Sequence, residues 1–260
     1  MIIKKIAILV YLKNSLIYLM CEVDMKKSVK RSIIAISIML ACMSLAIIMV
    51  GCDKVDKKLQ SMQNSVSYYS DTMMVGEDNN FYVELVSGSR ESALIADGEV
   101  GEMTAYSTLN VTPVGLDMTN RACTYKITGE NGEIEGGLEK NILGISYNAS
   151  ISDLSKIGKV DKLFIIVGEN TFEYTLTSIM EKGIDYKKAV ESVYNNCSSD
   201  LEGMFDGKEF KCEIYTKISC DRSKDPKQYF WFVNIVENSD NMFCVLVDMQ
   251  TGEIVAKKHR

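Results

Sequence analysis

Hydrophobic positions along the chain follow three patterns in succession. Residues 33–50 form an uncharged apolar run, and residues 79–178 contain short apolar stretches separated by turn residues. From about residue 184, apolar side chains recur at intervals of three and four. Short stretches bounded by turn residues are typical of strands, and intervals of three and four are typical of a helix. The patterns therefore predict an apolar N-terminal segment, a β-rich region and a mixed C-terminal region.

The β-rich region, residues 79–178, is predicted to contain many short strands. Each predicted strand is rich in β-branched or aromatic residues, and Gly, Asn or Ser residues follow most of them. Short strands at regular spacing predict an antiparallel sandwich or barrel. The predicted strands are residues 81–86, 101–111, 122–128, 141–149, 163–167 and 171–176, with one or two helical turns within 150–157.

The C-terminal region, residues 184–260, begins with the clearest helix pattern of the chain. Asp185 is well placed to cap this helix. Strands are predicted at residues 210–220, 229–236 and 242–249, followed by a short strand at 253–257. A single helix can cover one face of such a sheet. The predicted fold class is therefore α+β, with an antiparallel β-rich sandwich or barrel followed by a helix packed on a three- to four-stranded antiparallel sheet. The apolar stripe of the helix contains Tyr186, Ala189, Val190, Val193, Tyr194, Cys197, Leu201 and Met204.

Residues 52–78 are polar for most of their length and carry no recognisable strand pattern. Val55, Leu59, Met62, Val66 and Tyr69 recur at helical spacing. The segment is predicted to be a membrane-proximal tether, which takes the form either of a short amphipathic helix or of a loosely ordered spacer.

Residues 25–52 carry the features of an export signal. Lys26, Lys27, Lys30 and Arg31 precede the apolar run, and Met49, Val50, Gly51 and Cys52 follow it. These last four residues resemble the lipobox of bacterial lipoproteins. The resemblance implies a signal peptide over residues 25–51, cleavage by signal peptidase II and acylation of the Cys52 thiol, with palmitate among the acyl chains. Two acyl chains would anchor the protein stably to the outer face of the cell membrane, whereas one binds only marginally.

Two alternatives remain open at the N-terminus. The apolar run has about the length needed to span a bilayer, so it could remain as an uncleaved transmembrane helix. Residues 1–24 are apolar but interrupted by Lys13 and Asn14. We interpret them as the product of a start codon assigned too early, with Met25 as the initiator, or else as an extra membrane-associated segment. They are excluded from the fold prediction.

The charge balance argues against a nucleic-acid partner. The chain holds 29 Lys or Arg and 35 Asp or Glu, of which seven and two lie in residues 1–52. Residues 53–260 therefore keep 22 basic and 33 acidic residues. Contact with phosphate needs clustered cations, and no dense Lys or Arg patch occurs.

The residue types also argue against catalysis and metal binding. His259 is the only histidine, so Ser-His-Asp and Cys-His catalysis and His-rich zinc sites are excluded. The acidic segment 130–137 lacks the spacing of a calcium-binding loop. The sequence predicts no catalytic residue, no metal ligand and no cofactor. Five cysteines follow Cys52 without any CxxC spacing, which favours packing roles for Cys123, Cys197, Cys212, Cys220 and Cys244. An exported protein could also form disulfides, and the sequence does not specify whether these five cysteines are oxidised.

Three residues are candidates for ligand binding. Arg90, within the Ser- and Gly-rich segment 87–92, could bind an anion with its guanidinium group, although a hairpin loop explains the segment equally well. Tyr229 and Trp231 share one face of a predicted strand, opposite Phe230 and Phe232. One of the two faces must belong to the core, and the other either packs on a neighbouring domain or binds a partner.

The end of the chain resembles the PepSY domain. That family has a helix followed by antiparallel strands, and it ends in a pattern that Val247-Asp248-Met249-Gln250-Thr251-Gly252-Glu253-Ile254-Val255 follows. The segment 230–233 is similar to the aromatic central strand of the family. The resemblance covers residues 184–258, and it implies a role in restraining a peptidase. The pattern also has a structural explanation, because Gly252 suits a positive φ and Asp248 and Thr251 can bind nearby amides.

These observations predict an extracytoplasmic lipoprotein that binds a protein or peptide without catalysis and modulates a peptidase. A surface lipoprotein that binds a small molecule or carbohydrate is the first alternative, and a structural envelope protein is the second. The sequence does not specify the ligand.

Overall fold

The structure is a computed structural model that describes residues 56–92, 99–118, 121–142, 144–238 and 241–260. Its helices are α3 (Lys57–Asn64), α4 (Tyr186–Asn196) and α5 (Ser198–Leu201), with short 3-10 helices at Leu154–Ile157, Met180–Lys182 and Glu202–Met204. Its strands are β1 (Val66–Glu77), β2 (Phe81–Glu91), β3 (Met103–Pro113), β4 (Cys123–Gly129), β5 (Gly132–Gly137), β6 (Glu139–Lys140), β7 (Tyr147–Ser150), β8 (Val160–Val167), β9 (Asn170–Tyr174), β10 (Thr177–Ser178), β11 (Phe205–Asp206), β12 (Glu209–Phe210), β13 (Glu213–Asp221), β14 (Gln228–Asn238), β15 (Asn241–Asp248) and β16 (Ile254–His259).

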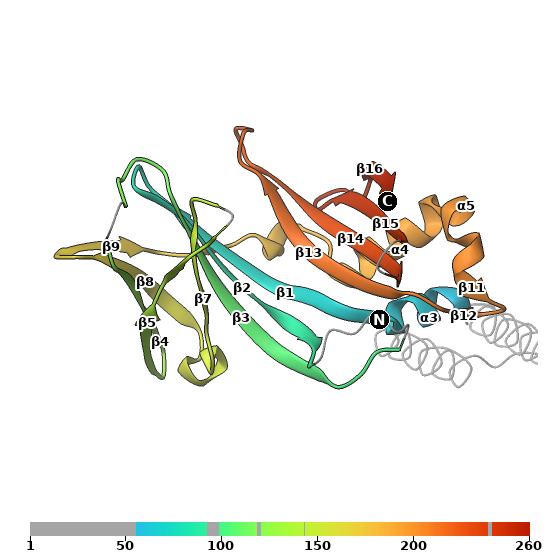
Figure 1. The fold of residues 1–260 in the computed structure, drawn as a ribbon, viewed down its shortest axis with the longest axis horizontal. Helices are drawn as coiled ribbons and strands as arrows, with labels where there is room; N and C mark the ends of the chain where they lie inside the picture. The colour runs from blue at the N-terminus through green and yellow to red at the C-terminus, as the bar shows by residue number, and fades with distance from the viewer. Residues whose placement is uncertain (1–55, 93–98, 119–120, 143, 239–240) are drawn as a thin grey trace, which may run out of the picture. The chain divides into compact units, whose positions relative to one another are not determined.

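The largest element of the described structure is one ten-stranded mixed sheet. Its strand order is β16-β15-β14-β13-β1-β2-β3-β7-β6, and β10 pairs with β1 beside β13. β1 is the central strand, antiparallel to β2 and parallel to β13 (Figure 1). The predicted fold class is therefore wrong. The chain is mostly β, and its C-terminal strands belong to a large mixed sheet rather than to a separate three- to four-stranded sheet.

The sequence analysis missed β1 because the strand contains a bulge. Its register with β2 shifts between Ser70 and Thr72, so Tyr68 and Met73 lie on the same face although their positions differ by an odd number. The bulge breaks the alternation of apolar and polar residues that identifies a strand. In addition, β1 and β13 pair residues that are almost 150 positions apart, and such pairing leaves no local pattern. Residues 66–77 are thus the centre of the sheet and not part of a tether.

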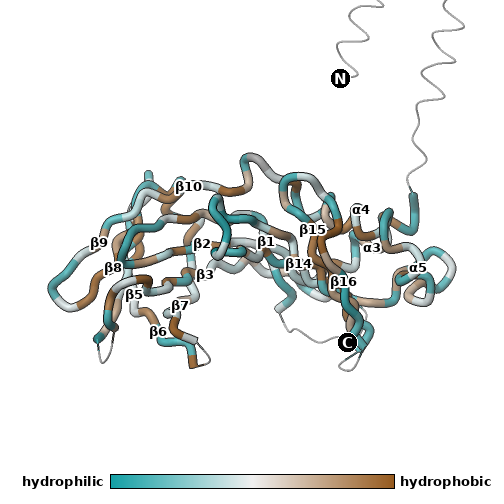
Figure 2. The backbone as a smooth tube through the Cα atoms, turned by 90° about the horizontal axis from the view of Figure 1, so that it is seen from above, coloured by the Kyte–Doolittle hydropathy of each residue, from teal (hydrophilic) through white to brown (hydrophobic). Residues whose placement is uncertain are grey.

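One hydrophobic core lies between the helices and the C-terminal strands. α4 packs Ala189, Val190 and Val193 against buried residues of β13, β14 and β15. Asp185 caps α4 as predicted, and its carboxylate accepts a hydrogen bond of 2.8 Å from the amide of Lys188. α3 adds the fully buried Met62 to the same core. In Figure 2 the three α-helices lie together at this end of the sheet.

A second core lies at the other end of the described sheet. There, β2 and β3 pack against a smaller sheet with the strand order β5-β4-β8-β9. The hairpin of β8 and β9 confirms the prediction of a hairpin for residues 163–176. From Leu163 to Val167, β8 alternates buried and partly exposed positions. Fully buried members of this core include Val83, Leu85, Leu109, Val111, Ile127, Leu163 and Ile165.

The turn between β15 and β16 has the geometry that its sequence predicts. Gly252 adopts a φ of 75°, and Oδ1 of Asp248 accepts bonds from the amides of Gln250 and Thr251 at 2.9 and 2.8 Å. The hydroxyl of Thr251 accepts a bond of 3.2 Å from the amide of Glu253. A β-hairpin turn is therefore sufficient to explain these residues.

The predicted signal peptide, lipobox and lipidation site lie outside the described residues. This includes Met49, Val50, Gly51 and Cys52 as well as residues 1–24. Across the part of the chain that the structure describes, no helix has both the length and the apolar character needed to cross a bilayer.

Candidate functional site

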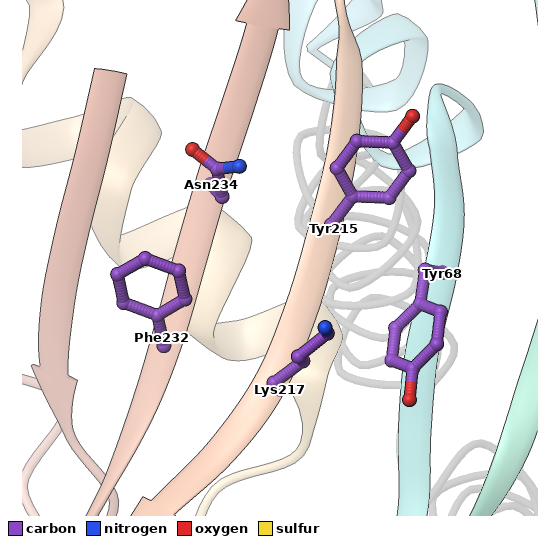
Figure 3. Close-up of a pocket in the computed structure, with 5 residues that line it drawn as sticks. All are labelled: Tyr68, Tyr215, Lys217, Phe232 and Asn234. Atoms are coloured by element: carbon purple, nitrogen blue, oxygen red, sulfur yellow. The ribbon is translucent and has the colours of Figure 1, made fainter. Parts of the chain in front are cut away.

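The face of the large sheet opposite α4 presents a group of aromatic side chains. Register pairs place Asn234, Tyr215 and Tyr68 side by side on β14, β13 and β1. Lys217 and Phe232 form the next pair along β13 and β14. We call these five residues the open face. Figure 3 shows them on three adjacent strands.

The open face is hollowed but shallow. Tyr68, Tyr215, Phe232 and Asn234 are partly exposed, and Lys217 is exposed. Together the five residues line a hollow of about 250 Å³. Large aromatic side chains that remain partly exposed and adjacent to one another are a feature of binding surfaces.

Two cations lie over tyrosine rings at this face. The ammonium group of Lys217 is 4.9 Å from the centre of the Tyr68 ring, and the guanidinium group of Arg90 is 5.8 Å from the centre of the Tyr106 ring. The two rings are 5.0 Å apart, so the four side chains form a continuous row. Within the described ranges, neither Lys217 nor Arg90 forms a salt bridge with a carboxylate.

A buried carboxylate fixes the orientation of Tyr215. The Tyr215 hydroxyl donates a hydrogen bond of 2.9 Å to Oε2 of Glu213, and the same oxygen accepts a bond of 2.8 Å from Ser67. Glu213 and Ser67 are both fully buried. Burial of Tyr215, together with its bond to Glu213, raises the pKa of the phenol to about 12, so Tyr215 is neutral at physiological pH.

The neighbouring Tyr106 is held in a similar way. Its hydroxyl lies 3.1 Å from that of Ser70, which is itself buried on the central strand. Burial is the main cause that raises the pKa of Tyr106 above its usual range. Because the Tyr215 and Tyr106 hydroxyls are hydrogen-bonded to buried side chains, their rings are already oriented before a ligand binds. This preorganisation reduces the entropy lost on binding.

The structure separates the three ligand-binding residues predicted from the sequence. Arg90 pairs with Tyr68 across β1 and β2, and therefore lies at the edge of the open face. Trp231 is fully buried, and its indole N–H donates a bond of 2.9 Å to the carbonyl of Ile184, so it belongs to the core. Tyr229 lines a separate hollow of about 140 Å³ with Lys227 and Met249, among others.

The sequence contained part of the signal for the open face. The strand predicted at residues 210–220 contains Tyr215 and Lys217, and the strand predicted at 229–236 has Phe232 on the face opposite Trp231. The sequence did not indicate Tyr68, which lies beside the bulge of β1, nor did it single out Asn234. Parallel pairing between β1 and β13 brings these residues together.

The described residues offer no obvious site for a metal ion. No group of three or more His, Cys, Asp or Glu side chains converges within the ranges given above. The open face itself contains one amide, one amine, two phenols and one phenyl ring.

Comparison with known proteins gives no relative for this chain. No protein-family model matches it, and neither the curated proteins nor the solved structures contain a significant match.

Proposed function

We propose that this chain is an extracytoplasmic lipoprotein, anchored through Cys52, that binds a protein or peptide without catalysing a reaction. The observation that supports the proposal is the open face, where Tyr68, Tyr215 and Phe232 present partly exposed rings from adjacent strands. Aromatic rings are enriched at protein interfaces because they bury a large area while losing little conformational freedom.

The size of the hollow favours a macromolecular ligand over a small molecule or carbohydrate. Small-molecule sites usually enclose about 300–1,000 Å³ and cover most of the ligand. The open face encloses about 250 Å³ and is spread over three strands. A peptide segment lying across the strands would cover this surface better than a compact ligand would.

The charges of the open face indicate the chemistry of the partner. Residues 53–260 are strongly acidic, yet Lys217 and Arg90 lie at this face without a salt bridge inside the described ranges. Complementary charge improves both specificity and the rate of association. We therefore expect a partner segment that combines apolar or aromatic side chains with Asp or Glu.

The partner is expected to dock on the face and not to extend the sheet at β16. That strand is an edge strand, but it carries Lys257, Lys258 and His259. Charged side chains on an edge strand oppose pairing with another chain. The resemblance of residues 184–258 to PepSY makes a peptidase one candidate partner, since four residues of the open face lie in that region.

The proposal can be tested with a panel of synthetic peptides. Purified chain should bind peptides that contain aromatic residues and Asp or Glu, and it should bind matched Lys-containing peptides more weakly. Lys217→Glu should weaken binding by about tenfold, which corresponds to about 1.4 kcal/mol. Fluorescence anisotropy gives the dissociation constants.

Lys159→Glu is the matched control, because Lys159 is also exposed but lies near the second core. It should leave the dissociation constant unchanged. Equal losses in both variants would show that only the net charge matters, which would contradict a site at the open face. Cleavage of any peptide by the purified chain would contradict the absence of catalysis.

A further inference from the structure

The first described helix, α3, begins five positions after the predicted lipidation site Cys52. Asp56 is the first described residue, and it follows Cys52 by four positions. Because an extended chain spans at most about 3.6 Å per residue, the backbone of Asp56 lies within about 14 Å of the backbone of Cys52.

The same limit applies to the rest of the fold at this end, because hydrogen bonds attach α3 to α4 and to β12. The Tyr194 hydroxyl on α4 donates a bond of 2.8 Å to Oδ2 of Asp56, and the other carboxylate oxygen caps α3 through the amide of Lys58 at 2.9 Å. Further along, the side chain of Gln63 donates a bond of 3.3 Å to the carbonyl of Lys187.

α3 is also attached to the short hairpin of β11 and β12. The amide of Phe210 donates a bond of 2.9 Å to the hydroxyl of Ser61, and Met62 is fully buried in the core. Releasing α3 to act as a spacer would break these bonds and expose Met62 to water. While α3 stays packed, the contour length of the chain between Cys52 and Asp56 is the upper limit on the distance between α3 and the predicted attachment site.

The end of the molecule that carries α3 also carries exposed cations. Lys57 and Lys58 lie on the first turn of α3, and Lys208 lies at the turn between β11 and β12. Asp206 and Glu209 share that hairpin, so charge alone does not fix which surface approaches an anionic membrane. The short connection between Cys52 and Asp56 determines which end of the molecule lies near the membrane. Lys57, Lys58 and Lys208 favour contact of that end with anionic headgroups.

We infer that the surface formed by the start of α3 and the β11–β12 turn lies against the anionic lipid headgroups. The inference rests on the membrane attachment in the proposed function. It holds for attachment through lipidated Cys52 and equally for an uncleaved helix over residues 33–50, because both end within a few residues of Asp56. Within the described chain, the β8–β9 hairpin lies at the end opposite α3 (Figure 1). In the inferred orientation this hairpin is therefore far from the headgroups.

Lysine footprinting on vesicles tests this orientation. The full chain is produced in a lipoprotein-processing bacterial host and reconstituted into phosphatidylglycerol and phosphatidylcholine vesicles. A membrane-impermeant amine reagent is then applied, and mass spectrometry reads the labelling rate of each lysine. Lys57, Lys58 and Lys208 should react several-fold more slowly than Lys159, which is exposed near the second core.

A linker variant provides the reference state. A Gly/Ser insertion of about 20 residues after Lys54 adds a mean span of about 25 Å. It should restore fast labelling at Lys57, Lys58 and Lys208 and leave Lys159 unchanged. Equal labelling of these lysines with and without the insertion would overturn the inferred orientation. The mass of the Cys52 peptide is a separate readout, since a missing acyl group there refutes lipidation but not the close approach of α3.

Discussion

The hydroxyl of Tyr215 donates a hydrogen bond to Glu213, and this bond connects the open face to a fully buried carboxyl group. The two residues are on the same face of β13, and the accepting oxygen of Glu213 also receives the hydroxyl of Ser67 from β1. One buried carboxylate thus joins the two strands that pair in parallel at the centre of the sheet. It also orients a ring that we expect to contact the ligand.

Removing either donor to Glu213 should destabilise the protein. Leaving a buried acceptor with one partner fewer costs about 1–3 kcal/mol, and Glu213 is fully buried. Ser67→Ala and Tyr215→Phe should therefore each lower the free energy of unfolding by that amount. Urea denaturation measures the change. Ser219→Ala, on the exposed side of the same strand, should change stability by less than about 0.5 kcal/mol.

The stability that depends on Tyr215 should be lost at high pH. In the folded protein the pKa of Tyr215 is raised from 10.0 to about 12, mainly by burial. Between these two values the unfolded chain has released the proton while the folded chain still holds it. The free energy of unfolding therefore falls as pH rises through this window. The decline should be smaller in Tyr215→Phe, as judged from urea midpoints on either side of pH 11. An equal decline in both proteins would contradict the assignment.

Gly88 should not tolerate a side chain, because it faces the bulge of the central strand. A Cβ atom added there would lie 2.0 Å from the carbonyl oxygen of Tyr69, which is backbone and cannot rotate away. Gly88→Ala should destabilise the fold by about 1–3 kcal/mol or more. Gly137→Ala on β5 is the control, since nothing lies within 4 Å of its added Cβ. Thermal unfolding of the two variants should separate them clearly.

The edge strand β16 should detach first on acidification. Asp200 accepts bonds from Lys257 at 2.7 Å and from His259 at 3.0 Å, and the His259 ring stacks on Phe243. The bonds from Lys257 and His259 lower the pKa of Asp200 below its usual 3.8. The stabilising contribution is therefore complete above 3.8 and is lost as pH falls through the lower, folded-state pKa.

Amide hydrogen exchange checks this prediction for β16. Asp200→Asn should lower the protection factors of residues 254–259 at neutral pH, and acidification should change those protection factors little further in that variant. Exchange in β14 should not change, because β14 is an interior strand that pairs with β13 and β15 and not with β16. A uniform increase across the sheet would instead indicate global destabilisation.

The sequence by itself determined most individual elements of this protein. Stretches of β-branched and aromatic residues bounded by turn residues located β2, β4, β8, β14 and β15, and helical spacing with an acidic cap located α4. The sequence also predicted the turn at Asp248 and Gly252, because that geometry depends on residues within five positions of one another. These features depend on local conformational preference, which the nearby sequence controls directly.

The tertiary structure alone decided how the elements combine. β1 crosses from one core to the other, and its parallel contact with β13 merges the two predicted modules into one sheet. A bulge hid its alternation, and its partners are far away in the chain. The open face depends on the same contact, because Tyr68 reaches Tyr215 and Lys217 only when β1 and β13 pair. Trp231 lies in the core because α4 covers its face of β14. The sequence of the strand does not specify which of its two faces the helix covers.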